Sequence, residues 1–82
     1  MQRPYHRKVF GEAIRRYRRK AGLTQEGLAE RVDVSPRYIQ SVEAGEYFPS
    51  LATLVRLRAV LRCEWNELFA GCDTGRKMVP LS

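Results

Sequence analysis

Hydrophobic residues recur at helical spacing in five short segments of the 82-residue chain, a pattern that predicts five helices. The first predicted helix runs from about Lys8 to Ala21, and Gly22 follows it as a helix stop. One face of this helix is apolar, while the rest of its surface carries arginines. The apolar positions are Phe10, Ala13, Ile14 and Tyr17.

Two short helices follow, joined by a tight turn. Thr24 is the expected N-cap of the first of them, and Gly27 weakens that helix by about 1 kcal/mol relative to alanine. Asp33 falls in the turn, since aspartate tolerates a left-handed backbone. Ser35 is the expected cap of the next helix, with Pro36 at the first position, where a missing N–H costs nothing. The inward apolar positions of both helices are Leu28, Ala29, Val32, Ile39 and Val42.

Two further helices complete the predicted fold. Gly45 ends the third helix, and Ser50 caps a fourth, leucine-rich helix. A fifth helix, from about Glu64 to Ala70, is expected to offer Trp65, Leu68 and Phe69 to the core or to a dimer interface formed with the end of the fourth helix and the tail. The only competing strand signal is a short extended piece at residues 78–81. The pattern therefore predicts an all-α fold, a compact five-helix bundle that contains a helix-turn-helix.

The length of the chain fits a single domain. We expect residues 1–7 to form a basic N-terminal arm, either disordered or reaching along DNA. The helix-turn-helix domain is expected to span residues 8–71. The C-terminal tail, residues 72–82, is expected to be disordered or to pair with a second subunit.

The charge of the chain indicates a polyanionic partner. The chain contains 15 Lys and Arg residues and 9 Asp and Glu residues, which gives a formal net charge of +6 and a pI of about 9.9. Among the first 20 residues every charged side chain is basic except that of Glu12. Nucleic acid is the first candidate partner, and an acidic protein or a membrane surface is the second. A solvated basic helix face is the structural alternative.

Other classes of protein find little support in the sequence. No apolar run approaches the roughly 18 residues of a membrane span, and no signal-peptide core follows the basic N-terminus, so a soluble, intracellular protein is expected. Cys63 and Cys72 lack the spacing of a zinc or redox motif and His6 is the single histidine, so we expect no metal and no cofactor. Cys63 is expected to be a buried thiol. No phosphate loop or nucleophile–base pair indicates an enzyme.

The outward side of the third predicted helix carries the candidate chemistry. Its polar side chains can reach base edges or phosphates in a major groove. Arg37 is alternatively a solvated surface arginine, and Tyr38 alternatively packs against a neighbouring helix. The outward residues are Pro36, Arg37, Tyr38, Gln40 and Ser41.

A family resemblance rests on residues 23–57, which read LTQEGLAERVDVSPRYIQSVEAGEYFPSLATLVRL. This run resembles the lambda-repressor and Cro-like (XRE-type) helix-turn-helix proteins, and the resemblance spans roughly Phe10 to Phe69. The Tyr38–Ile39 pair followed by Glu43 is most similar to restriction-modification controller proteins. Phage-type repressors and antitoxins share most of the same pattern of helix-turn-helix residues.

The resemblance implies a sequence-specific transcription regulator that binds double-stranded DNA. It implies a homodimer that reads a (pseudo)palindromic operator, with the helix at about residues 35–43 in the major groove. Gln25 would bond a phosphate, the loop of residues 44–47 would offer main-chain N–H groups to phosphates, and Arg18 and Glu43 would form a structural salt bridge. The implied DNA-binding residues are Gln25, Ser35, Pro36, Arg37, Tyr38, Gln40, Ser41 and Ala44.

A second hypothesis is a protein-interaction module, either an antitoxin or a co-regulator with weak or secondary DNA binding. Trp65, Phe69 and the C-terminal tail motivate it. The resemblance also implies a cytoplasmic location, with the protein encoded by a bacterium or phage and associated with the nucleoid when bound to DNA.

Overall fold

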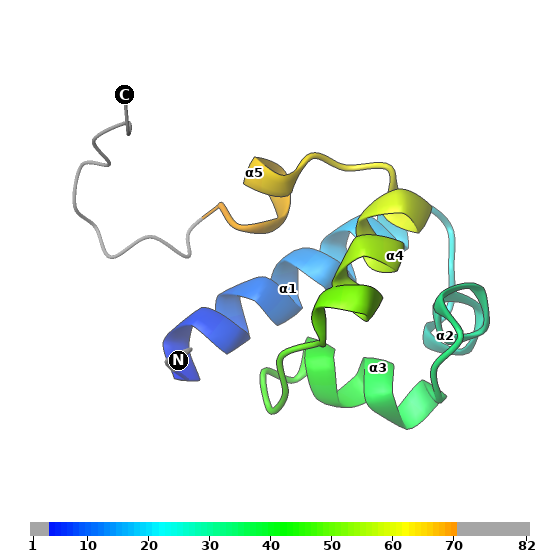
Figure 1. The fold of residues 1–82 in the computed structure, drawn as a ribbon, viewed down its shortest axis with the longest axis horizontal. Helices are drawn as coiled ribbons and strands as arrows, with labels where there is room; N and C mark the ends of the chain where they lie inside the picture. Colours follow the sequence, from blue (N-terminus) through cyan, green and yellow to red (C-terminus); the bar gives the residue numbers. More distant parts are fainter. Residues whose placement is uncertain (1–3, 71–82) are drawn as a thin grey trace.

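The computed structural model of the protein describes residues 4–70, and its regular structure is entirely helical (Figure 1). This finding confirms the predicted all-α fold with five helices. The expected extended piece at residues 78–81 and the tail at 72–82 lie outside the described residues. The helices are α1 (Pro4–Lys20), α2 (Gln25–Val32), α3 (Pro36–Glu43), α4 (Leu51–Leu61) and α5 (Trp65–Leu68).

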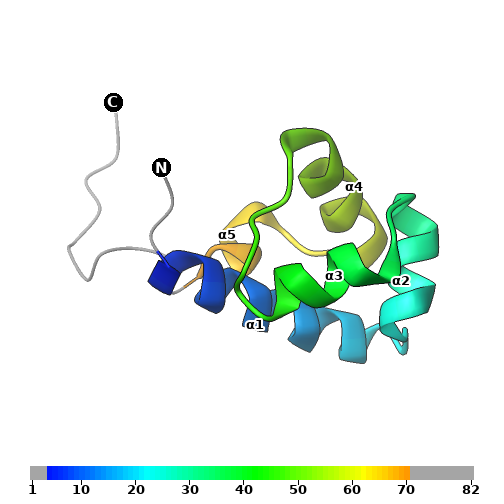
Figure 2. The ribbon, with the colours of Figure 1, turned by 90° about the horizontal axis from the view of Figure 1, so that it is seen from below.

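The short helix α3 lies at the surface and is supported by its neighbours. Seen from below, α3 lies in front, between α1 and α4, with α2 at one of its ends (Figure 2). Both α1 and α2 contact α3 directly. A helix of eight residues is marginal alone in water, so these contacts are what keep α3 folded.

The helix α1 begins earlier than the sequence pattern indicates. Its first residue is Pro4 instead of about Lys8, so residues 4–7 of the expected arm continue the helix. A proline fits the first helical position because its missing N–H has no partner there anyway. The apolar face expected for this helix begins at Phe10, so the pattern did not reveal the first turn.

The predicted caps and turn residues are confirmed. Thr24, Ser35 and Ser50 each accept a hydrogen bond from the backbone N–H three residues further on, at 2.9, 3.1 and 3.3 Å respectively. Asp33 adopts the left-handed conformation, with φ of 61°. These features fix the turn between α2 and α3.

The core gathers apolar side chains from all five helices. Ala29 lies where α2 and α3 meet and is 1% exposed, as the pattern predicts. Leu68 is fully buried, and Phe69 stacks on Phe10 with 5.4 Å between ring centroids. Cys63 is buried as expected, and burial raises the pKa of its thiol, which keeps it neutral. The largest fully buried side chains are Phe10, Ile14, Leu28, Ile39, Leu57, Leu68, Val32 and Val42.

Of the two places expected for Trp65, the core and a dimer interface, the structure excludes the core. The residue is 39% exposed, whereas Leu68, one turn further along α5, is fully buried. Leu51 and Val55 of α4 are exposed as well. These side chains leave apolar surface uncovered in the single chain.

A second close helix contact depends on a glycine that the sequence pattern does not single out. A Cβ atom at Gly11 would overlap the carbonyl oxygen of Val42 and lie 2.7 Å from that of Glu43. The helix α1 therefore passes directly over the backbone of the last turn of α3. Only glycine allows this approach.

Candidate nucleic-acid interface

The outward side of α3 is polar because its inward side supplies the core. Ile39 and Val42 are fully buried. Arg37, Gln40 and Ala44 follow one another at spacings of three and four residues, so they lie on one outward line, and all three are exposed. The structure thus brings these expected DNA-binding residues together on one surface.

The N-terminal end of α3 holds two more expected contacts. The Ser35 hydroxyl accepts the hydrogen bond of the Tyr38 N–H, so it acts as a cap and retains its own O–H as a donor. Pro36 is exposed beside it. An open hollow on this side of α3 is lined by Ser35, Arg37, Tyr38, Ser41, Glu46 and Tyr47.

The surroundings of Tyr38 are those of a packing residue. Its side chain is half-buried, and its hydroxyl oxygen accepts a 3.2 Å hydrogen bond from the Ser50 N–H. The ring of Tyr47 meets it edge to face, with centroids 5.1 Å apart. Tyr38 therefore fastens α3 to the start of α4 and holds Tyr47 at the border of the outward surface.

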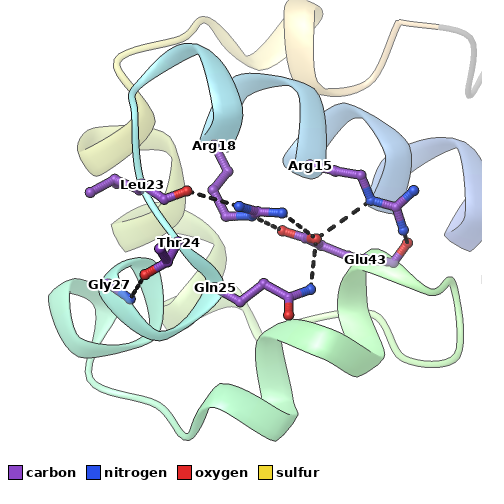
Figure 3. A network of polar contacts seen from close by, with 7 residues as sticks. All are labelled: Arg15, Arg18, Leu23, Thr24, Gln25, Gly27 and Glu43. Atoms are coloured by element: carbon purple, nitrogen blue, oxygen red, sulfur yellow. Dashed lines mark hydrogen bonds and ion pairs between the residues drawn. The ribbon is translucent and has the colours of Figure 1, made fainter.

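The buried carboxylate of Glu43, near the C-terminal end of α3, accepts hydrogen bonds from α1 and α2. Glu43 is 2% exposed, and the guanidinium of Arg18 donates to it from Nε at 2.6 Å and from Nη2 at 3.2 Å (Figure 3). Arg18 also donates from Nη1 to the carbonyl of Leu23 at 2.8 Å. Arg18 and Glu43 thus form the ion pair that the family resemblance implies, and α1 is tied to the end of α3.

The side chain of Gln25 has a protein partner that sequence reasoning missed. Its Nε2 donates a 3.0 Å hydrogen bond to Oε1 of Glu43 (Figure 3). In this arrangement the amide group is held at the junction of α1, α2 and α3. The helix α2 begins at this residue, and the backbone N–H groups at a helix start attract phosphates.

Arg15 is a further residue that the sequence did not identify. Its Nε lies 3.6 Å from Oε1 of Glu43, and its Nη2 donates to the Glu43 carbonyl at 3.5 Å. Its side chain remains 41% exposed, so it borders the solvent next to α3. The sequence does carry a signal for this contact: Arg15 is three residues from Arg18, so both side chains lie on the same side of α1 and near Glu43.

Two other kinds of feature, a membrane-spanning helix and a metal-ligand cluster, are absent from residues 4–70. None of the helices there is both long and apolar enough to cross a membrane. No group of three or more potential ligand side chains is placed to hold a metal ion within that range.

The fold and the outward surface of α3 define a helix-turn-helix DNA-binding unit, because a short polar helix is presented at the surface by two supporting helices. A helix-turn-helix family model matches residues 14–68. The chain therefore belongs to the Cro/C1-type helix-turn-helix family and is a DNA-binding transcription regulator.

Similar proteins support this membership. An uncharacterized HTH-type transcriptional regulator of Methanothermobacter thermautotrophicus is 43% identical over 65 residues, covering 78% of this chain and 94% of that protein. Control protein C.MunI of Mycoplasma sp is 34% identical over 65 residues, covering 78% and 88%. The crystal structure of the restriction-modification controller protein C.AhdI from Aeromonas hydrophila matches with a TM-score of 0.72 and 35% identity, covering 77% of this chain and 96% of that one.

Proposed function

We propose that the protein reads a specific DNA sequence by placing α3 in the major groove, with Arg37 at the base edges. One observation carries this proposal: Arg37 is exposed on the outward line of α3, and no salt bridge of the described residues engages it. A free guanidinium can bond guanine O6 and N7 together, which is the commonest specific contact. Gln40 and Ser41 flank it as further donors and acceptors.

Replacing Arg37 with alanine should weaken binding to the preferred DNA site by about 1–3 kcal/mol, or roughly 5- to 150-fold. Binding to random duplex should change far less, because it depends on phosphate contacts. The matched control is Arg31→Ala, which removes an exposed arginine from the last turn of α2. Dissociation constants on both duplexes test this, and an equal loss on both would contradict base reading by Arg37.

We also propose that the regulator acts as a homodimer on a (pseudo)palindromic operator. One unit reads only a short half-site, and two units would read half-sites about 34–36 Å apart. Trp65 supports an interface at α5 and the end of α4, because it is 39% exposed and stacks on Phe69. The guanidinium of Arg58 lies over its ring, with Cζ 5.1 Å from the ring centroid. A partly exposed tryptophan of this kind is typical of an interface centre.

The change Trp65→Ala should raise the dimer dissociation constant by at least about 30-fold, which corresponds to a loss of about 2 kcal/mol at an interface centre. Leu51→Ala is the control, since Leu51 is 74% exposed at the opposite end of α4. Sedimentation equilibrium of both variants measures the effect. If Leu51→Ala dissociates the dimer and Trp65→Ala does not, the interface lies at the start of α4 instead.

The likeness to C.AhdI and to control protein C.MunI supports control of a restriction-modification gene set as the particular role. The same likeness favours a regulator over an antitoxin or co-regulator that only binds protein. A cytoplasmic location with nucleoid association fits this role.

A further inference from the structure

A row of basic residues runs along α1 on the side next to α3. Lys8, Arg15 and Arg19 are separated by seven and four residues, so at 3.6 residues per turn they fall within about 40° of one another around the helix. Lys8 and Arg19 are exposed and Arg15 is half-buried. None of the three belongs to the DNA contacts that the family resemblance implies.

The row lies against the C-terminal end of α3. The stem of Lys8 packs on Gly45, where an added Cβ would be 2.6 Å from the Lys8 Cγ. One turn further along α1, Gly11 touches the backbone of Glu43, and Arg15 reaches the side chain and carbonyl of the same residue (Figure 3). Seen from the side on which α3 is presented, α1 lies directly beside it (Figure 2).

The charges of the row are available to an external anion. Among residues 4–70, no ion pair involves Lys8 or Arg19. Arg15 is held in place by a long 3.6 Å pair with Glu43, which a second anion can share. The row therefore begins beside the last turn of α3 and extends along α1 with a net positive charge, since Glu12 is the one carboxylate that lines the same hollow as Arg15 and Arg19.

Two other cations of α1 are placed differently. Arg16 and Lys20 lie over the ring of Tyr17, at 5.7 and 5.6 Å from its centroid. They are four residues apart and about 60–140° further around the helix from the row, and they border the same hollow as Arg15 and Arg19 from its other side. These residues supply a control on the same helix.

We propose that Lys8, Arg15 and Arg19 bind backbone phosphates of the DNA strand that borders the groove occupied by α3. The inference rests on the proposed placement of α3 in the major groove. When a helix fills that groove, about 12 Å wide, a sugar–phosphate backbone lies on each side of it. The element beside the C-terminal end of α3 is α1, so its basic row meets one of these backbones and fixes the position of α3 along the duplex.

The test compares two double variants of equal net charge, Lys8→Gln with Arg19→Gln, and Arg16→Gln with Lys20→Gln. Two lost phosphate contacts should reduce the slope of log Kobs against log salt concentration by about 1.8 for the first pair. The loss should be alike on the preferred and the random duplex, so the ratio of the two affinities stays unchanged. The second pair should keep the wild-type slope.

Neutral methylphosphonate linkages then locate the contact. Placed singly in the strand beside the half-site, they should weaken the wild type at one or two positions and leave the Lys8, Arg19 variant unaffected there. Equal slopes for the two double variants would overturn the proposal, since only net charge would then matter. Failure of base reading is detected separately, as a wild-type protein that binds preferred and random duplex equally.

Discussion

Replacing Glu43 with alanine should lower the free energy of unfolding by about 3–5 kcal/mol, a large fraction of the total for a domain of this size. The carboxylate is the shared acceptor of Arg18 and Gln25, and it is 2% exposed. Its removal leaves the guanidinium of Arg18, whose side chain is only 11% exposed, without a countercharge. Urea unfolding monitored by circular dichroism measures the difference.

Two further variants separate the ion pair from simple loss of charge. Glu46→Ala removes an exposed carboxylate three residues away and should change stability by less than about 0.5 kcal/mol. Replacing both partners, with Arg18→Met and Glu43→Leu, should restore most of the stability because no buried charge remains. An unfolding curve for Glu43→Ala that overlies the curve for Glu46→Ala would refute the structural role of the pair.

Replacing Gly11 with alanine should destabilise the protein by about 1–3 kcal/mol, although alanine is normally the better helix residue by about 1 kcal/mol. The new methyl group would overlap backbone carbonyls of Val42 and Glu43, which can move only if α1 and α3 separate. Thermal unfolding at fixed pH and salt is the measurement.

The second glycine inside a helix provides the contrast. A Cβ at Gly27 would meet only side-chain atoms, the Thr24 Oγ1 at 3.2 Å and the Leu23 Cδ2 at 3.7 Å. Gly27→Ala should therefore stabilise α2 by up to about 1 kcal/mol. The account of the α1–α3 contact is wrong if Gly11→Ala raises the melting temperature as Gly27→Ala is expected to do.

Most of the fold follows from local sequence signals. Apolar periodicity places the helices, and the hydrogen bonds of capping residues such as Thr24 and Ser35 are local to the chain, so the sequence alone predicts them. The start of α1 at Pro4 escaped prediction because the apolar face expected for this helix begins only at Phe10. The sequence left Trp65 between the core and an interface, because how far α5 covers its own residues depends on its packing against α1 and α4.

The candidate site also contains some features that local sequence signals predict and others that depend on how the helices pack. The outward line of Arg37 and Gln40 follows from helical spacing around the buried Ile39. The bond between Gln25 and Glu43 joins residues 18 positions apart and depends on how α2 crosses α3, which no local pattern encodes. The contact of Gly11 with the last turn of α3 is of the same kind, because it exists only after α1 has packed.

Selection of binding sites from a randomised duplex pool, by the wild type and by the Arg37→Ala variant, tests most directly that the outward side of α3 reads bases. The wild type should enrich a two-fold symmetric motif, and the variant should lose the preference for guanine at one position in each half-site. Failure of the wild type to enrich any motif, with only salt-sensitive binding to all duplexes, would contradict sequence reading by α3. If the variant enriches the same motif with an unchanged guanine preference, Arg37 does not read bases.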